Sequence, residues 1–309
     1  MSSDLRLEQD GTRLTRGTNT ELRIVSTIDC PDDHRAPGPH DDVAWRDLEL
    51  HDIPQLASFA PEEWGIALDA ALLQHVGRSY FHARVASIGS RIVAVGQGIA
   101  TGRNGWIGNI IVQPDVRNRG FGSRMTQVVM AELHSRGCSS MLLVATPMGE
   151  PVYTRLGFRR ASEYVFLDVP RLPPPRTSAI RRLNPADLND VLGMDARVSG
   201  ETRAELLDPH LASGWVHADP GSRIDGVFLP TFGAGLVLGE ATSAGLDLLR
   251  FKHAYFSRQA VVPAANAAAV QFLVAHGARE TARAPRMALG EEADWRPECV
   301  FARAAGFCG

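Results

Sequence analysis

The chain has 309 residues, a length that is long for one domain and suits two domains of about 100–200 residues each. Hydrophobic residues make up 44% and charged residues 22% of the sequence, which excludes a largely disordered protein. The formal net charge of −3 supplies no basic field for binding a phosphate backbone, so we expect no nucleic-acid partner.

The cysteines are widely scattered and lack the paired spacings typical of zinc sites or disulfide frameworks. They are Cys30, Cys138, Cys299 and Cys308. This distribution predicts a reducing, cytoplasmic setting and no metal cofactor. Because no uninterrupted apolar run approaches the roughly 20 residues that cross a bilayer, we also expect no membrane association and no export.

The first 42 residues are rich in Asp, Arg, Thr, Pro and Gly and predict an irregular extension with one strand-like patch at 22–25. From residue 43 onward, apolar periodicity and turn signals predict regular elements. In order, these are a strand over 44–48, helices from 52 and over 62–75, a hairpin over 80–88 and 92–100, and a strand over 106–112. A loop then leads to a helix over 123–136, a strand over 141–145, a helix over 150–156 and a strand over 164–167.

Three consecutive prolines, residues 173–175, cannot continue a helix or a sheet ladder and predict a spacer. We therefore expect a domain over 43–170, a proline-rich linker over 171–178 and a second domain over 179–309. The plan repeats in the second domain, which predicts a diverged duplication; the alternative is two unrelated α/β domains that share turn chemistry. The matching segments are 179–183 with 44–48, 221–224 with 89–92, 260–263 with 144–147, and a helix over 267–276 with the helix ending at Gly157.

The segment between the predicted strand over 106–112 and the helix over 123–136 carries the chemical signal of the sequence. It contains Arg117, Arg119, Gly120 and Gly122. Glycines let backbone amides approach a ligand, and the start of the following helix points unsatisfied amides and a partial positive charge at the same place. Arginines add donors suited to phosphate oxygens, so the segment predicts an anion site. The competing interpretation is a surface turn whose glycines only cap a helix.

The spacing Arg-x-x-Gly-x-Gly after a strand ending Val-x-Pro resembles the acyl-CoA signature of the GNAT superfamily of N-acyltransferases. A second motif follows in order, because residues 153–158 (YTRLGF) are similar to the family's Tyr-x-x-x-Gly-Phe ending. The resemblance covers about residues 43–169. It implies an α/β (α+β) fold with a mixed central sheet flanked by helices, present twice in tandem.

The same resemblance implies acetyl-CoA as co-substrate and assigns the residues that bind it. Loop amides would bind the CoA pyrophosphate, and the preceding strand would pair with the pantetheine amides and polarise the acetyl carbonyl. The cofactor-binding residues are then Ile110, Ile111, Val112, Arg117, Asn118, Arg119, Gly120, Phe121, Gly122 and Ser123. Tyr153 would lie near the thioester sulfur and assist the departing thiolate, unless it is only packed on an apolar helix face.

No general base is assigned by the sequence. The central strand offers Asn109, whose amide cannot act as a base, where family members often carry a Glu. Side chains that would border an acceptor cleft are Glu62, Glu63, His75 and His82. The family's CoA-facing Asn is also replaced, by Thr146, and Gly149 stands where Ala is usual.

The second domain repeats the predicted order of elements but lacks the residues that carry the acyl-CoA motif. Asn266 and Ala269 match the family's Asn-x-x-Ala ending, but Leu273 stands where the tyrosine should be. The segment 237–245 replaces the phosphate loop, carries no arginine, and contains Glu240, which would repel an anion. We expect a degenerate repeat that covers the acceptor cleft or mediates formation of a homodimer.

The sequence therefore predicts an N-acetyltransferase that moves an acetyl group from acetyl-CoA to a primary amine of a small molecule by direct attack. A non-catalytic CoA-binding sensor or interaction protein is the alternative from another class. A tandem acetyltransferase similar to mycothiol synthase is a further alternative, although the active copy of that enzyme is the carboxy-terminal one.

Overall fold

The computed structural model describes residues 43–61, 67–291, 294–306 and 308, so the extension predicted over 1–42 lies outside the described residues. The first half of the described chain contains β1 (Val43–Asp47), α1 (Ile53–Leu56), α2 (Leu68–Leu73), β2 (Phe81–Ile88), β3 (Arg91–Thr101), β4 (Asn104–Val112), α3 (Phe121–Ser135), β5 (Ser140–Val144), α4 (Glu150–Arg155) and β6 (Arg159–Asp168). The second half contains β7 (Ile180–Arg182), α5 (Leu188–Ser199), α6 (Ala204–Leu211), β8 (Trp215–Ala218), β9 (Ile224–Leu229), β10 (Leu236–Gly239), α7 (Thr242–Tyr255), β11 (Gln259–Pro263), α8 (Ala267–Ala275), β12 (Arg279–Gly290) and β13 (Val300–Ala302).

The elements predicted in the first half are found close to their expected bounds. β6 is longer than the strand predicted over 164–167, because its first five residues are exposed or half-buried and give no apolar pattern. The helix predicted over 62–75 is described only as α2, since residues 62–66 lie outside the described chain. In the second half, Lys252, His253 and Ala254 near the end of α7 are buried.

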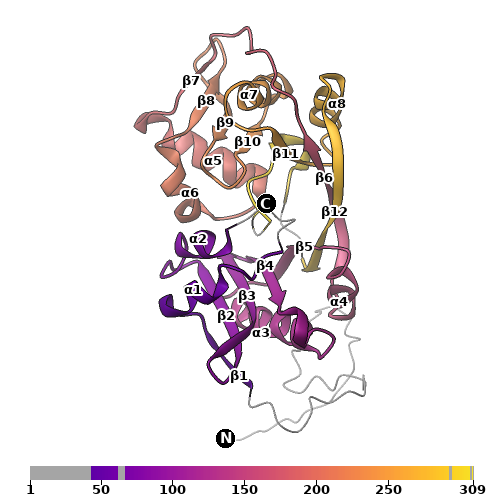
Figure 1. Ribbon diagram of the computed structural model, residues 1–309. Coiled ribbons are helices and arrows are strands. Elements are labelled where there is room, and N and C mark those ends of the chain that lie inside the picture. The colour runs from indigo at the N-terminus through magenta and orange to yellow at the C-terminus, as the bar shows by residue number, and fades with distance from the viewer. Residues whose placement is uncertain (1–42, 62–66, 292–293, 307, 309) are drawn as a thin grey trace, which may run out of the picture. The chain divides into compact units, whose positions relative to one another are not determined.

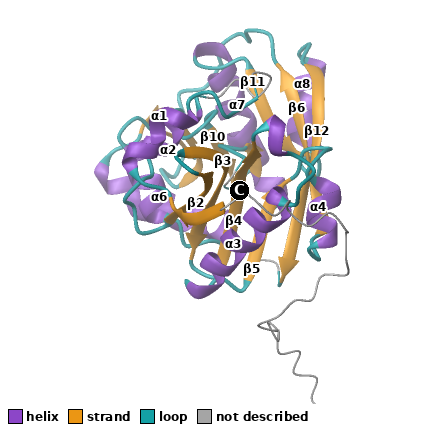
Figure 2. Cartoon of the chain, turned by 60° about the horizontal axis from the view of Figure 1, so that its bottom comes forward, coloured by secondary structure: helices purple, strands orange, loops and turns teal. Residues whose placement is uncertain are grey.

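The strands form two sheets. The larger sheet has the order β1-β2-β3-β4-β5-β12-β6-β11, and the smaller has the order β13-β10-β9-β8-β7. The recorded pairs are antiparallel except for β4 with β5, so the larger sheet is mixed. Helices flank the sheets, as Figure 2 shows. The chain therefore has the α/β fold with a mixed central sheet that the sequence predicts.

The larger sheet is built by both halves of the chain. β12, from the second half, pairs with β5 on one side and with β6 on the other, and β6 pairs in turn with β11. In Figure 1 the yellow β12 lies beside β6, with α8 near one end of this pair and α4 near the other. A strand of the second half, β12, thus lies between two strands of the first half, and a strand of the first half, β6, lies between two strands of the second. The boundary at 171–178 stays a prediction, whereas the hydrogen-bonded sheet extends across it.

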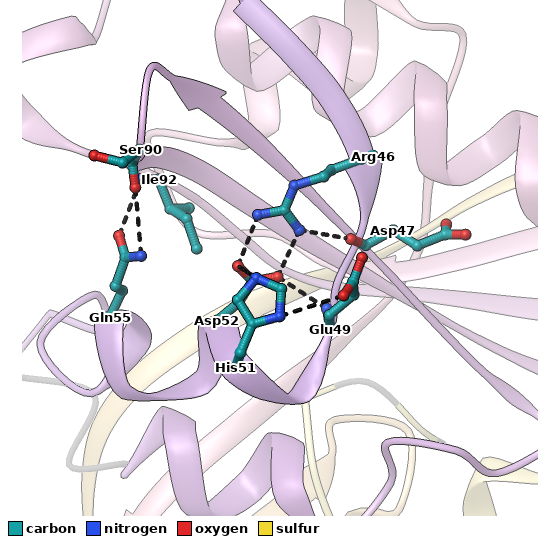
Figure 3. Close-up of polar contacts among 8 residues, drawn as sticks. All are labelled: Arg46, Asp47, Glu49, His51, Asp52, Gln55, Ser90 and Ile92. Carbon is teal, nitrogen blue, oxygen red and sulfur yellow. Dashed lines mark hydrogen bonds and ion pairs between the residues drawn. The ribbon is translucent and has the colours of Figure 1, made fainter.

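One polar network occurs in both halves, and Figure 3 shows the copy in the first half. In the first half, the guanidinium of Arg46 donates two hydrogen bonds to Asp52, at 2.6 and 2.7 Å, and the Asp52 carboxylate also accepts from the Glu49 amide. In the second half, Arg181 donates to Asp187 at 2.7 and 2.8 Å, and Asp187 accepts from a backbone amide three residues earlier. The network fixes the turn between the first strand and the first helix of each half.

The core consists of three apolar clusters. One lies between the larger sheet and α3 and another packs around α7 and α8. The third contains side chains of both halves, from α1, α2 and the first sheet to α5, α6 and the smaller sheet. The two halves therefore share a continuous core. None of the helices in the described part of the chain is long and apolar enough to cross a membrane.

Because β12 separates β5 from β6, we expect that residues 1–178 expressed alone do not fold cooperatively. The isolated fragment would expose the edges of two strands that are paired in the intact chain. Chemical denaturation followed by circular dichroism measures this, and co-expression with residues 179–309 should restore a sigmoidal transition. A cooperative transition of the fragment alone would contradict the shared sheet.

A second prediction concerns Lys252 of α7, which is fully buried and whose Nζ donates one hydrogen bond, of 2.9 Å, to the Gly235 carbonyl. Burial lowers the pKa of Lys252 to about 7, whereas it is about 10.4 in an unfolded chain. Between these values only the unfolded chain holds the proton, so the free energy of unfolding rises with pH by up to about 1.4 kcal/mol per unit. Lys252→Met removes this dependence. The free energy of unfolding of the wild type minus that of the variant should therefore rise from pH 7 to pH 10, and a constant difference would contradict the assignment.

Candidate functional site

β4 and β5 run side by side only at their starts. Residues 104–106 pair with residues 140–142 in parallel, and the pairing ends at Trp106 and Leu142 although both strands continue. β5 stays attached to β12 up to Val144. Beyond Trp106, no described strand pairs with the β5-facing edge of β4. This edge offers backbone donors and acceptors to an extended ligand.

A bulge lies in this unpaired part of β4. Gly108 faces Gln97 and Ile111 faces Val95, so Asn109 and Ile110 stand opposite the single residue Gly96. The backbone of Asn109 is left-handed, with φ of 48°. Its side-chain amide donates to Gln97 Oε1 at 3.0 Å. Asn109 therefore shapes the strand and offers no base, as its chemistry predicts.

After β4, the chain makes a turn and enters α3 through Gly120. Gly120 has a left-handed φ of 79°, which glycine adopts without steric cost. The first amides of a helix have no partner within it, and among the described residues none accepts a hydrogen bond from the backbone of Gly120, Phe121 or Gly122. A Cβ on Gly120 would meet nothing within 4 Å, and a Cβ on Gly122 would meet only Val112, at 3.9 Å. The space beside these two glycines is therefore open.

The arginines of the loop take different positions. Arg117 Nε donates to the Val112 carbonyl at 3.0 Å and ties the loop to the end of β4. The guanidinium carbon of Arg119 lies 5.9 Å from the centroid of the Phe121 ring. The acidic residue of the loop, Asp115, is held by a two-point ion pair with Arg91 at 2.7 and 2.8 Å. The pairing neutralises the charge of Asp115, which would otherwise repel an anion.

The structure brings the sequence-predicted binding residues together in one continuous segment. They occupy the end of β4, the following loop and the first turn of α3: Ile110, Ile111, Val112, Arg117, Asn118, Arg119, Gly120, Phe121, Gly122 and Ser123. Phe121 is buried and stacks on Trp45, with 6.0 Å between ring centroids, so its side chain serves packing. Its backbone amide lies in the first turn of α3.

Tyr153 lies on α4 and faces the same apolar cluster as Ile110 and Val112. Its ring packs against Gly149, where a Cβ would come within 2.8 Å of Tyr153 Cε2, and against the edge of Phe158. The packing requires Gly149 to lack a side chain. Burial raises the pKa of Tyr153 to about 12, so the phenol stays protonated at neutral pH. Within the described chain, its hydroxyl has no hydrogen-bond partner.

The histidines suggested as bases are poorly placed for that role. His82 lies near Glu132, 3.7 Å away, at the far end of α3. That is about 16 Å along the helix from Phe121. His75 is buried and pairs with Tyr80 at 3.1 Å, and burial lowers the pKa of both histidines. Glu62 and Glu63 lie outside the described residues.

Sequence reasoning missed Glu201, which comes from the second half. Its carboxylate accepts hydrogen bonds from Trp106 Nε1 at 2.8 Å and Thr101 Oγ1 at 2.9 Å, on the face of the first sheet opposite α3. Burial raises the pKa of Glu201. It also lines a cleft of about 770 Å³ with Asn104 and Ser140. No local pattern marks this residue, because its partners are about a hundred positions away in the sequence.

The corresponding place in the second half is closed. Only Glu240 and Ala241 separate β10 from α7, and a Cβ on Gly239 would lie 2.7 Å from the backbone of Gly245. β13 pairs with β10, and the Arg303 amide that follows β13 donates to the Val261 carbonyl of β11. β13 therefore fills the position between the two strands that would correspond to β4 and β5.

Comparisons with known proteins agree with this geometry. The family model of the FR47-like proteins matches residues 89–167, from the β2–β3 turn to β6. No curated protein matches the sequence. A candidate acetyltransferase from Pyrococcus horikoshii is similar in structure, with 17% identity, a TM-score of 0.75, and coverage of 90% of this chain and 100% of its own. A GCN5-related N-acetyltransferase from Sphaerobacter thermophilus has 14% identity and a TM-score of 0.60 over 84% of this chain and 100% of its own.

Both neighbours match over their whole length, so the likeness includes both halves of this chain. Identities below 25% establish a common fold and leave the reaction to be argued from the site. The described chain has the fold of the GCN5-related N-acetyltransferases, and its residues 89–167 match the FR47-like family model.

Proposed function

We propose that this protein transfers an acetyl group from acetyl-CoA to the primary amine of a small molecule. The observation that carries the proposal is the junction of two features: β4 parts from β5 at Trp106, and the same strand leads into open backbone amides at Gly120 and Gly122. The first feature suits an extended, amide-bearing arm and the second suits a pyrophosphate. Acetyl-CoA carries both groups at opposite ends of one chain.

In this proposal the backbone of Ile110, Ile111 and Val112 pairs with the pantetheine arm, and the amides at the start of α3 bind the pyrophosphate. The amine nitrogen forms a bond to the acetyl carbonyl carbon, and the carbon–sulfur bond breaks with its electron pair on sulfur. The amine gives up one proton to solvent. Tyr153 donates a hydrogen bond from Oη to the departing thiolate, which a protonated phenol can do at neutral pH.

We further infer that the two halves are diverged repeats, of which the first is active. The repeated Arg–Asp network and the matching positions of α4 and α8 support the duplication. The short β10–α7 connection and the position of β13 support a degenerate second half. A chain of this kind binds one acetyl-CoA. This assignment argues against the arrangement of mycothiol synthase, in which the carboxy-terminal copy is active.

Gly122→Glu should abolish acetyl-CoA binding while the protein remains folded. Glutamate forms helices better than glycine and suits the first turn of a helix, so folding is not impaired. Its charge, however, would lie against the pyrophosphate, and we expect Kd to rise at least about 100-fold. Isothermal titration calorimetry measures this and should give one acetyl-CoA per wild-type chain. Gly122→Ala is the matched control without charge; equal affinities for the two variants would contradict the loop assignment.

Tyr153→Phe should lower kcat by about 10- to 100-fold, because it removes one hydrogen bond to a charged leaving group. The ring contacts with Gly149 and Phe158 are kept, so the affinity for acetyl-CoA should not change. Release of free CoA thiol measures turnover. Tyr255→Phe, at an exposed position on α7, serves as the control. Equal turnover of the Tyr153 variant and the wild type would remove Tyr153 from the chemistry.

A further inference from the structure

Arg303 is a buried cation whose side-chain donors are unused. It follows β13, is 3% exposed, and its Nε and Nη1 atoms find no hydrogen-bond acceptor in the described chain. Its guanidinium carbon lies 4.3 Å from the centroid of the Tyr164 ring. Tyr164 is itself fully buried, and its hydroxyl also lacks a partner among the described residues. Three donor atoms of two adjacent side chains are thus unsatisfied in one place.

The acids of this region are committed to other groups. Asp195 forms a two-point ion pair with Arg203, at 2.7 and 2.8 Å. Glu201 accepts from Trp106 and Thr101. Burial raises the pKa of the Cys308 thiol to about 11, so it is uncharged at neutral pH. No carboxylate of the described chain forms an ion pair with Arg303.

A buried charge without a counter-ion, and a buried hydroxyl without a partner, are both unfavourable for the folded state. A ligand with anionic oxygens would satisfy all three donors at once. A guanidinium presents its donors in a planar fork that matches a carboxylate or a phosphate. The unsatisfied donors of Arg303 and Tyr164 therefore favour an anionic ligand.

The position of this pair relates it to the proposed site of transfer. Tyr164 of β6 stands opposite Ala284 of β12, and β12 lies next to β5. The strand that carries Tyr164, β6, therefore lies two strand spacings, about 10 Å, from β5. Arg286, on the same strand β12, pairs in register with Val144 at the end of β5.

Aromatic rings connect the two places. The guanidinium of Arg286 lies 5.6 Å from the Trp106 ring and 4.3 Å from the Trp295 ring, and Trp295 lies 6.1 Å from Tyr164. The neighbours of Trp295 in the sequence, Asp294 and Arg296, line the cleft of about 770 Å³. Trp295 therefore lies between the residues that line the cleft and Tyr164.

We propose that the acceptor carries an anionic group, a carboxylate or a phosphate, which binds to Arg303 and Tyr164 while its amine reaches the parted ends of β4 and β5. The proposal rests on the proposed acetyl transfer for the identity of the ligand, although the anion site can be tested without it. The proposal also assigns a role to β13, because Arg303 directly follows this strand and lies in the interior that both halves share.

Binding is tested first, by thermal unfolding of the full chain at constant ionic strength. The probes are acetate, N-acetylglycine and inorganic phosphate, with N-acetylglycinamide as the neutral match. At least one anion should raise the Tm of the wild type, the neutral amide should not, and Arg303→Met should lose the response. Arg279→Met, at a guanidinium that is 80% exposed, is the matched control and should keep it. Acetate and phosphate distinguish the two kinds of anion.

The unliganded variant supplies an independent readout. If Arg303 is an uncompensated buried charge, Arg303→Met should unfold at the same temperature as the wild type or higher. A clearly lower Tm would mean that Arg303 stabilises the fold through the protein alone and would overturn the proposal. The absence of any anion response in the wild type would overturn it as well.

Turnover then relates the site to the acceptor. With matched amines that differ only in a carboxylate or its amide, the wild type should favour the carboxylate at least tenfold in kcat/KM. Arg303→Met should remove this preference and Arg303→Lys should restore part of it. Acetyl transfer without any preference would overturn the anionic acceptor and leave the proposed function intact. Failure to bind acetyl-CoA would refute the proposed function, and the thermal measurements would still decide the anion site.

Discussion

The position of β12 between β5 and β6 is the constraint on which the rest of the structure depends. β5 and β6 are close in the sequence, yet they cannot pair, because a strand from the second half occupies the place between them. Backbone donors and acceptors buried in a sheet must be paired, so the first half cannot complete its sheet alone. For this reason we expect the halves to fold together, and they also share an apolar core.

The same arrangement creates the site. β5 is held by β12 along its whole length, whereas β4 follows β3 through the bulge at Asn109 and Ile110. The two strands consequently part after Trp106 and leave one edge of β4 unpaired. The strand then ends directly at the loop whose glycines open the start of α3. One bulge, one neighbouring strand and two glycines therefore produce the unpaired strand edge and the open helix start on which the proposed acetyl-CoA site rests.

The second half repeats the Arg–Asp network of the first but connects its strand and helix differently. Its strand-to-helix connection has no room for a phosphate loop, and β13 occupies the place beside β10. What this half supplies to the first is structural and chemical: β12 completes the sheet, Glu201 bonds to Trp106, and Arg303 enters the shared interior. Under the duplication that we propose, the second half has lost its own cofactor site and borders the acceptor site of the first half.

The sequence by itself determined the local features. The turn at 89–91, the loop from Arg117 to Gly122 and the start of α3 follow from glycine conformation and apolar periodicity, which act over a few residues. The prediction for Tyr153 also rests on a local motif. Only the tertiary structure decided the rest: β12, whose first half is exposed and polar at several positions and whose centre contains Pro285, is a strand because a sheet position is open to it. Glu201 and Arg303 have roles only through partners far away in the chain, and no pattern of neighbouring residues encodes such contacts.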